Sequence, residues 1–176
     1  LRPADAEETA VAWQYAMAEK RPVAMILSRQ NVKSLPALKS SRQEEAKQAV
    51  KGAYIVMDSA KAQVVMLASG SEVSTLTDGA ELLQKDGIPV RVVSVPSEGL
   101  FRDQPKSYQE SVLPKDIIRY GMTSGLSINL RGLVGENGTI HGCDHFGYSA
   151  PFKVLDEKFG YNGQTVYEEV KALLNK

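Results

Sequence analysis

The sequence predicts an α/β fold: a three-layer α/β/α domain from about residue 52 to the C-terminus, with a mainly parallel sheet of about five strands and one antiparallel edge strand. Strand and helix patterns alternate through this part of the chain. The strand cores are short continuous apolar runs, which are typical of parallel strands covered on both faces. The first two strands, 53–57 and 64–68, are joined by a turn too short for a parallel crossover, so one edge strand should be antiparallel.

The next helix is predicted from apolar residues at three- and four-residue spacing, which gives it one apolar face, and it should end at Gly87. That face consists of Val73, Leu76, Ala80 and Leu83. Further strands are expected at 90–95, 116–121 and 139–143, and short helices around Leu100 and over 108–112.

Two helices are predicted near the C-terminus. Ser149 should cap a helix that runs through Phe159 and stops at Gly160. The spacing of Thr165 and Glu168 predicts a capping box for the last helix. The apolar face of that helix is formed by Val166, Val170 and Leu173.

The first fifty residues have a different pattern. Asp5 and Glu8 predict a capping box for a helix over 6–19, in which Trp13 is expected to be a core anchor. The apolar stripe of this helix consists of Ala6, Ala10, Trp13 and Met17. The run 23–27 predicts a strand buried on both faces, and the polar stretch 33–51 an interdomain linker with one helical turn near Glu44. A strand at 23–27 cut off from a larger sheet would be disordered, swapped or dimerised.

Composition excludes several classes of function. Lys+Arg and Asp+Glu are each 21, so the formal net charge is zero and the basic patch that nucleic acid or an anionic membrane needs is not indicated. The single cysteine, Cys143, excludes an internal disulfide and suits a reducing compartment. No apolar run is long enough to span a bilayer. We therefore expect a cytoplasmic protein that binds neither nucleic acid nor membrane.

Seven segments, in the same order along the chain, resemble segments of the transketolase family. They are RPAD at 2–5, LSRQN at 27–31, KGAY at 51–54, ASGSEV at 68–73, VRVVSVPS at 90–97, YQESVLP at 108–114 and FGYSAP at 146–151. The resemblance implies the fold of the transketolase C-terminal domain over 52–176, a linker over 33–51, and the C-terminal remnant of the pyrimidine-binding domain over 1–32. The segment 122–132 departs from the family pattern, which puts local interface contacts in doubt.

The resemblance also implies a function. Transketolases use thiamine diphosphate and a divalent metal, Mg or Ca, to move a two-carbon ketol unit between phosphorylated sugars in the pentose phosphate pathway, and a homodimer is implied. The cofactor is held in regions that this chain lacks, so we expect none bound here, no catalytic or metal-binding residue, and no activity of the isolated chain. Its role would be structural, supporting the dimer. The start at Leu1 rather than at a methionine is what a fragment would show.

One substrate-binding residue is implied by the resemblance. Arg29, in the 27–31 motif, matches the arginine that grips the sugar phosphate, for which a guanidinium is suited because it donates two parallel hydrogen bonds to phosphate oxygens. From its spacing alone, Arg29 would be read as a strand-end arginine in a surface salt bridge.

Two other features have alternative readings. Gly70, Ser71 and Glu72 follow a strand and open a helix, where backbone N–H groups could hold an anion, but the Glu72 carboxylate would repel one and favours a plain βα turn. His141, Cys143 and His145 are spaced by two residues, so a strand would put all three on one face, and imidazole and thiolate suit zinc. Ordinary packing of these residues is favoured, because no further Cys or His cluster is available.

Two rival identities remain open at this level. The chain could be a non-catalytic subunit of a split transketolase, which should have its own methionine and a complete pyrimidine-binding domain. It could also be the equivalent domain of a 2-oxoacid dehydrogenase or a deoxyxylulose-phosphate synthase. The motifs at 28–31 and 146–151 favour transketolase over both.

Overall fold

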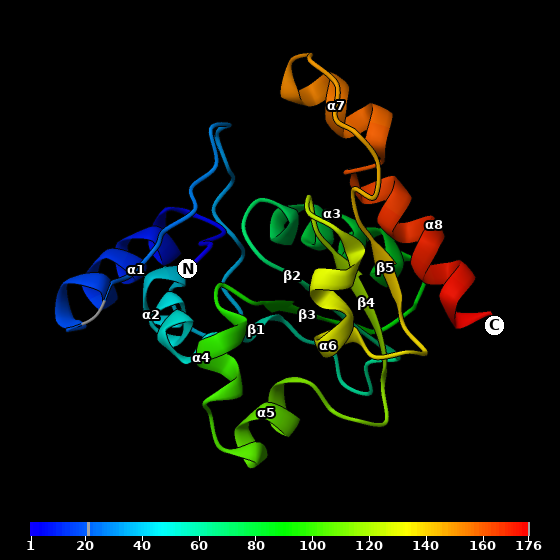
Figure 1. Cartoon of the computed structure of the whole chain (residues 1–176). Coiled ribbons are helices and arrows are strands. Elements are labelled where there is room, and N and C mark those ends of the chain that lie inside the picture. Colours follow the sequence, from blue (N-terminus) through cyan, green and yellow to red (C-terminus); the bar gives the residue numbers. More distant parts are fainter. Residues whose placement is uncertain (21, 176) are drawn as a thin grey trace.

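A computed structural model describes residues 1–20 and 22–175, and residue 176, the predicted end of the last domain, lies outside this range (Figure 1). The described chain contains a five-stranded sheet with the order β1-β3-β2-β4-β5. Its strands are β1 Tyr54–Met57, β2 Val64–Ala68, β3 Val90–Ser94, β4 Ile118–Met122 and β5 Thr139–His141. Only β1 is antiparallel to its neighbour, so the predicted sheet with one antiparallel edge strand is confirmed.

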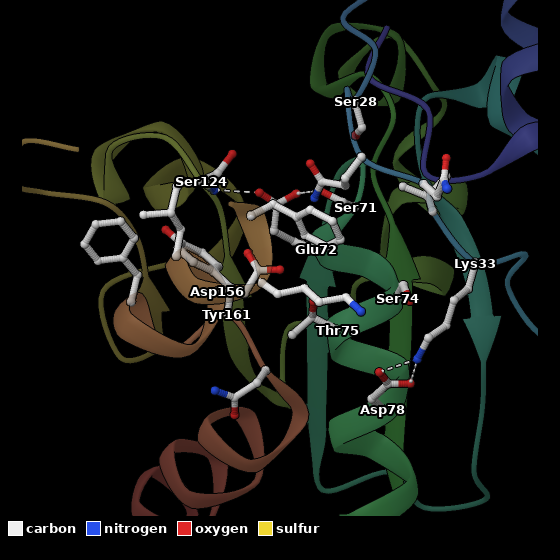
Figure 2. Close-up of a pocket in the computed structure, with 18 of the residues that line it drawn as sticks. Ser28, Lys33, Ser71, Glu72, Ser74, Thr75, Asp78, Ser124, Asp156 and Tyr161 are labelled. Atoms are coloured by element: carbon white, nitrogen blue, oxygen red, sulfur yellow. Dashed lines mark hydrogen bonds and ion pairs between the residues drawn. The ribbon is translucent and has the colours of Figure 1, made fainter. Parts of the chain in front are cut away.

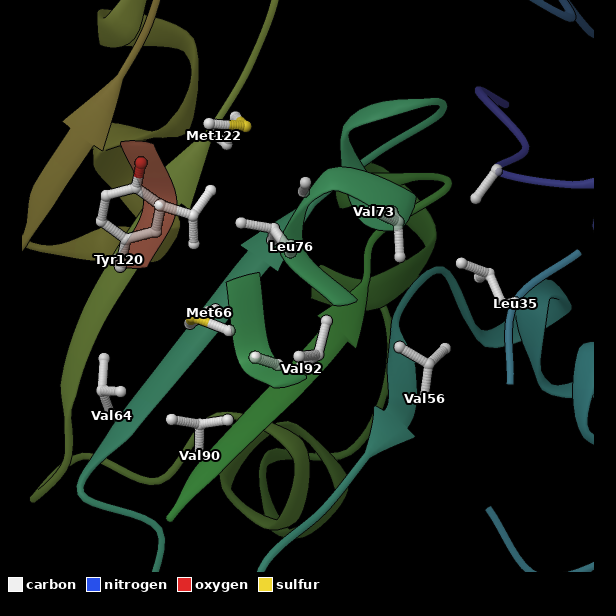
Figure 3. Packing of buried hydrophobic residues seen from close by; sticks show 14 of the residues in the cluster. Leu35, Val56, Val64, Met66, Val73, Leu76, Val90, Val92, Tyr120 and Met122 are labelled. Carbon is white, nitrogen blue, oxygen red and sulfur yellow. The ribbon is translucent and has the colours of Figure 1, made fainter. Parts of the chain in front are cut away.

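Helices cover both faces of the sheet. One face packs against α3 Glu72–Lys85 and α8 Gly163–Leu174. The other face packs against α4 Glu98–Arg102, α5 Lys106–Val112, the 3-10 helix η2 Ser127–Leu130 and α6 Arg131–Val134. Because side chains alternate along a strand, Val64 and Met66 of β2 enter the first layer, and Val65 and Leu67 enter the second. The first layer is shown in Figure 3.

The predicted apolar face of α3 is confirmed. Val73, Leu76, Ala80 and Leu83 are all fully buried, and Gly87 follows the helix with a φ of +76°.

At the opposite edge of the sheet from β5, the register of β1 with β3 shifts between Ile55 and Met57, which marks a β-bulge.

The starts of the last two helices differ from the prediction. α7, Phe152–Phe159, begins after Pro151, so Ser149 is not its cap; proline suits this place because its fixed φ matches a helix start. α8 is capped by Asn162, whose side chain accepts a hydrogen bond from the Thr165 N–H. The capping box of Thr165 and Glu168 is therefore wrong, because an asparagine one turn earlier already does the capping.

The predicted helix near the N-terminus forms, but its inward face is wrong. α1, Ala6–Ala18, is capped by Asp5 as expected. Trp13 and Met17 are 53% and 75% exposed, so Trp13 is not a core anchor and the stripe of Ala6, Ala10, Trp13 and Met17 does not face the core. The buried positions are instead Glu8, Val11 and Ala12. A count of apolar spacing cannot find this face because a carboxylate lies at its centre.

The run 23–27 is extended but is not a strand of a sheet. Ile26 and Leu27 are 62% and 51% exposed, so the prediction of a strand buried on both faces is wrong for this chain. Its backbone contacts are with Leu1: the Leu1 nitrogen donates to the Ala24 carbonyl, and the Ile26 N–H donates to the Leu1 carbonyl.

The stretch 33–51 is more ordered than a linker with one turn. It contains α2, Arg42–Ala46, and the 3-10 helix η1, Lys47–Lys51, so the helical turn near Glu44 is confirmed and is followed by a second.

No helix within residues 1–20 and 22–175 is long and apolar enough to cross a bilayer. In Figure 1, the extended segment between α1 and α2 and the helix α7 both project on the same side of the sheet.

Candidate functional site

A cavity of about 890 Å³ lies at the carboxyl end of the sheet, between the segment 26–33, the start of α3 and α7 (Figure 2). Ser71 and Glu72 follow β2, Ser124 follows β4 and Cys143 follows β5, and all four line it. The crevice outside the carboxyl ends of parallel strands is where open α/β sheets commonly bind ligands. The cavity is therefore the candidate site.

The Glu72 carboxylate at the start of α3 is paired with Arg2. The Arg2 guanidinium approaches its two oxygens at 3.0 and 2.6 Å, and the Ser124 N–H donates to it at 2.8 Å. The Glu72 side chain is only 4% exposed. A negative charge held in the first turn of α3 disfavours an anion there, which supports the βα-turn reading of Gly70, Ser71 and Glu72.

The opposite side of the cavity is formed by α7 and the residues after it. Burial raises the pKa of the Asp156 carboxyl, and the nearby charge of Glu72 raises it further. Burial likewise raises the pKa of Tyr161, whose hydroxyl donates to the Thr123 carbonyl at 2.9 Å. At the rim, the Lys33 ammonium contacts the Asp78 carboxylate at 2.9 Å, as Figure 2 shows. The cavity thus contains charges of both signs and several hydroxyls.

Arg29 lies on the loop beside this cavity. Its neighbours Ser28, Gln30 and Asn31 line the cavity, whereas Arg29 is exposed and is not among the lining residues. It makes no hydrogen bond or ion pair within the part of the chain that the structure describes. The loop therefore presents an uncommitted guanidinium next to the cavity.

The structure does not bring His141, Cys143 and His145 together. β5 ends at His141, two residues earlier than the predicted strand, and the His141 ring contacts Glu169 at 3.0 Å and the Phe159 carbonyl at 2.8 Å. The hydrogen bond to Glu169 raises the pKa of His141. Cys143 and His145 lie near each other instead, with 3.8 Å between Sγ and Nδ1. Among the described residues, no group of three or more His, Cys, Asp or Glu could hold a metal ion.

A buried polar cluster between α1 and the sheet was missed by the sequence analysis. The Arg42 guanidinium contacts Asp5 at 2.6 Å and Glu8 at 3.3 Å, and Glu8 accepts hydrogen bonds from the hydroxyls of Tyr54 and Ser94 at 2.6 and 2.7 Å. Burial raises the pKa of Glu8, outweighing the partners that lower it. We call these five residues the joint cluster. The only sequence signal of it was the capping pair Asp5 and Glu8.

Comparison with known proteins places this geometry in a family. The profile of the transketolase-like TK C-terminal domain matches residues 52–162. The transketolase of Halalkalibacterium halodurans is 40% identical over 99% of this chain, which spans 26% of that relative's length.

Solved structures agree with the family match. The structure of transketolase from Leishmania mexicana has a TM-score of 0.88 and 35% identity, covering 99% of this chain and 25% of that one. A transketolase from Pichia stipitis in complex with sedoheptulose 7-phosphate has a TM-score of 0.86 and 30% identity over 99% of this chain and 25% of its own. The chain described here belongs to the transketolase family, as a transketolase-like C-terminal domain together with the segment that precedes it.

Proposed function

We propose that this chain acts as the C-terminal part of a transketolase, an enzyme that transfers a two-carbon ketol unit between phosphorylated sugars in the pentose phosphate pathway. The observation that carries the proposal is the similarity over 99% of the chain to transketolases about four times as long. The single free thiol, Cys143, supports a reducing, cytoplasmic location.

The described residues do not offer a site for the divalent metal that accompanies thiamine diphosphate in such an enzyme. Mg²⁺ and Ca²⁺ need several oxygen ligands, and no suitable cluster exists in residues 1–20 and 22–175. The Glu72 carboxylate in the cavity is already paired with Arg2. We therefore assign the cofactor to the rest of the enzyme, and we expect this chain to be inactive by itself.

Exposed apolar side chains support the existence of further protein around the chain. Trp13 and Met17 on α1, and Ile26 and Leu27 in the extended run that follows it, are each more than half exposed. Exposed apolar surface of this kind normally faces another protein surface. We assign it to the rest of a pyrimidine-binding domain, with 1–32 as its tail, 33–51 as the linker and 52–176 as the C-terminal domain.

A second exposed apolar group lies on α7 and on the loop that precedes it. Phe146 and Tyr148 are 97% and 63% exposed, and Val154 on α7 is 52% exposed. This surface supports the proposed dimer-supporting role of the chain.

Arg29 is the proposed substrate contact. Its guanidinium is exposed and has no partner in the described chain, so it could hold the phosphate of a sugar substrate through two parallel hydrogen bonds. A charge-assisted bond of this kind contributes about 1.5–3 kcal/mol, or roughly ten- to a hundredfold in affinity.

The proposal can be tested with a chimaera in which this chain replaces the matching quarter of the H. halodurans transketolase. We expect the chimaera to transfer ketol units when thiamine diphosphate and magnesium are added, and the chain alone to be inactive. Addition of the chain in trans to the remainder of the relative tests the split-subunit alternative. Turnover by the isolated chain would refute the assignment.

In the active chimaera, Arg29→Ala should raise KM for phosphorylated sugars about tenfold or more and leave KM for unphosphorylated ones nearly unchanged. Arg102→Ala is the matched control, because Arg102 is a half-exposed arginine that pairs with Glu98 on the other face of the sheet. Equal effects of Arg29→Ala on both kinds of substrate would remove the phosphate role.

A further inference from the structure

Leu1 and Arg2 form a two-sided backbone bridge. Leu1 pairs with the segment that leads to Arg29, through the carbonyl of Ala24 and the N–H of Ile26. Arg2 pairs in the other direction, since its N–H donates to the Pro96 carbonyl at 2.8 Å and its carbonyl accepts from the Gly70 N–H at 3.1 Å. Successive residues of an extended chain direct their hydrogen bonds to opposite sides, so two residues suffice to join the sheet end to the loop.

The Arg2 side chain fixes this bridge to α3. Besides its two contacts with Glu72, the guanidinium donates to the Ser69 carbonyl and to the Ser124 hydroxyl. Gly70 makes room for it, because a Cβ at Gly70 would lie 2.7 Å from the guanidinium carbon of Arg2, and the φ of +62° there also favours glycine.

The far end of the same loop is attached to the same helix. Lys33 contacts the Asp78 carboxylate through both oxygens, at 2.9 and 3.2 Å. Ile26 is therefore held to α3 through Leu1, Arg2 and Glu72, and Lys33 is held to it through Asp78. Arg29 lies between these two attachments, in the stretch 27–32, which makes no hydrogen bond to the rest of the described chain.

We propose that Glu72 and Asp78 of α3, acting through Arg2 and Lys33, are positioning residues for Arg29. This inference rests on the proposed role of Arg29 in phosphate binding. A loop held at both ends before substrate arrives loses less conformational entropy when its arginine engages a phosphate. The C-terminal domain would then contribute to substrate affinity without touching the substrate.

The first test is hydrogen exchange on this chain by itself. Glu72→Gln and Asp78→Asn should each raise the exchange rate of the Ile26 amide, which donates to the Leu1 carbonyl, several-fold and leave those of β2 and β3 unchanged. Glu169→Gln is the matched control, since Glu169 is a half-buried carboxylate that holds His141 and Tyr120 and does not contact the loop. Unchanged exchange of the Ile26 amide in both variants would overturn the inference, whatever the enzyme does. Asp78 is exposed, so its variant should fold even if Glu72→Gln does not.

The second test is kinetic and uses the chimaera described above. Asp78→Lys should raise KM for phosphorylated sugars about three- to tenfold with kcat unchanged, and the exchange of charges in Lys33→Asp with Asp78→Lys should restore it. A purely structural role would lower kcat, or affect unphosphorylated substrates equally.

The two hypotheses fail in different ways. If Arg29→Ala is not selective for phosphorylated sugars, the phosphate role fails, and the exchange result still decides whether α3 holds the loop. If Arg29→Ala is selective and Asp78→Lys is not, only the positioning inference is overturned.

Discussion

The sheet core and the carboxylates of the joint cluster are both buried, but different interactions hold them. In the core, aliphatic side chains such as Met66, Leu76 and Val92 pack on one face of the sheet (Figure 3). In the joint cluster, Asp5 and Glu8 share the guanidinium of Arg42 at 1% and 0% exposure. Stability of the core follows from apolar burial, whereas the joint depends on each charge keeping its partner.

This difference has a consequence for mutation. A truncated core side chain loses contacts in proportion to the atoms removed. A charge removed from the joint leaves the opposite charge buried and unpaired, which costs more than the pair itself contributes. The joint should therefore be the more sensitive of the two regions to a single substitution.

The largest effect is expected for Arg42→Met, which keeps the aliphatic length and removes the charge. Asp5 and Glu8 would remain buried without their cation, so the free energy of unfolding should fall by about 3–5 kcal/mol in urea titration. Arg102→Met serves as the control, because its pair with Glu98 is exposed and should contribute less than about 1 kcal/mol. A loss at Arg42 no larger than that at Arg102 would contradict the comparison.

A somewhat smaller effect is expected for Leu76→Ala in the core. Leu76 is fully buried against the sheet, so the cavity and the lost contacts should cost about 3 kcal/mol in the same titration. If this substitution cost clearly more than Arg42→Met, the core and not the joint would be the more sensitive region. Gln84→Ala on the exposed part of α3 is the matched control.

A pH dependence is expected from His141, the last residue of β5, whose ring contacts Glu169 of α8. The hydrogen bond to Glu169 raises the pKa of His141 above the 6.5 of an unfolded chain. Its contribution to stability is fully present below pH 6.5 and is lost as the pH rises through the folded pKa. Glu169→Gln should remove this part of the decline. His145 is present in both the original chain and the Glu169→Gln variant, so its contribution cancels when their stabilities are compared. If stability changed with pH equally in the two proteins, the His141–Glu169 pair would not be coupled to folding.

The smallest effect is expected for Trp13→Gln. Trp13 is 53% exposed, so in the isolated chain its replacement should change the free energy of unfolding by less than about 0.5 kcal/mol. In the chimaera the same substitution should be clearly more destabilising, because the proposed pyrimidine-binding domain covers this face. Equal, small effects in both proteins would argue against that cover.

The parts of the fold that were predictable are those encoded by neighbouring residues. The spacing of Val73, Leu76 and Ala80 decides which face of α3 is buried, and short apolar runs locate β2 and β3. The joint cluster could not be predicted this way, because Glu8 and Ser94 are 86 positions apart and Arg42 is distant from both. The failed strand at 23–27 has a related cause: its apolar run predicts a buried strand, but among the described residues no strand lies beside it to form a sheet.

The candidate site was predictable only in part. Arg29 could be selected by its motif. The attachment of its loop to α3 could not be predicted, because Arg2 and Glu72 are 70 positions apart in the sequence. The capping errors at Ser149 and Thr165 have a local cause, because Pro151 and Asn162 compete for the same role nearby.

The two margins of the sheet also limit how copies of this molecule can associate. β5 offers only three residues, and β1 is disturbed by its bulge, so neither margin presents the long regular row of free N–H and C=O groups that would let a foreign strand add on. Self-association by continuing the sheet across two molecules is therefore disfavoured. If copies associate, side chains on helices and loops would make the contacts, where a few substitutions can strengthen or abolish them without disturbing the backbone.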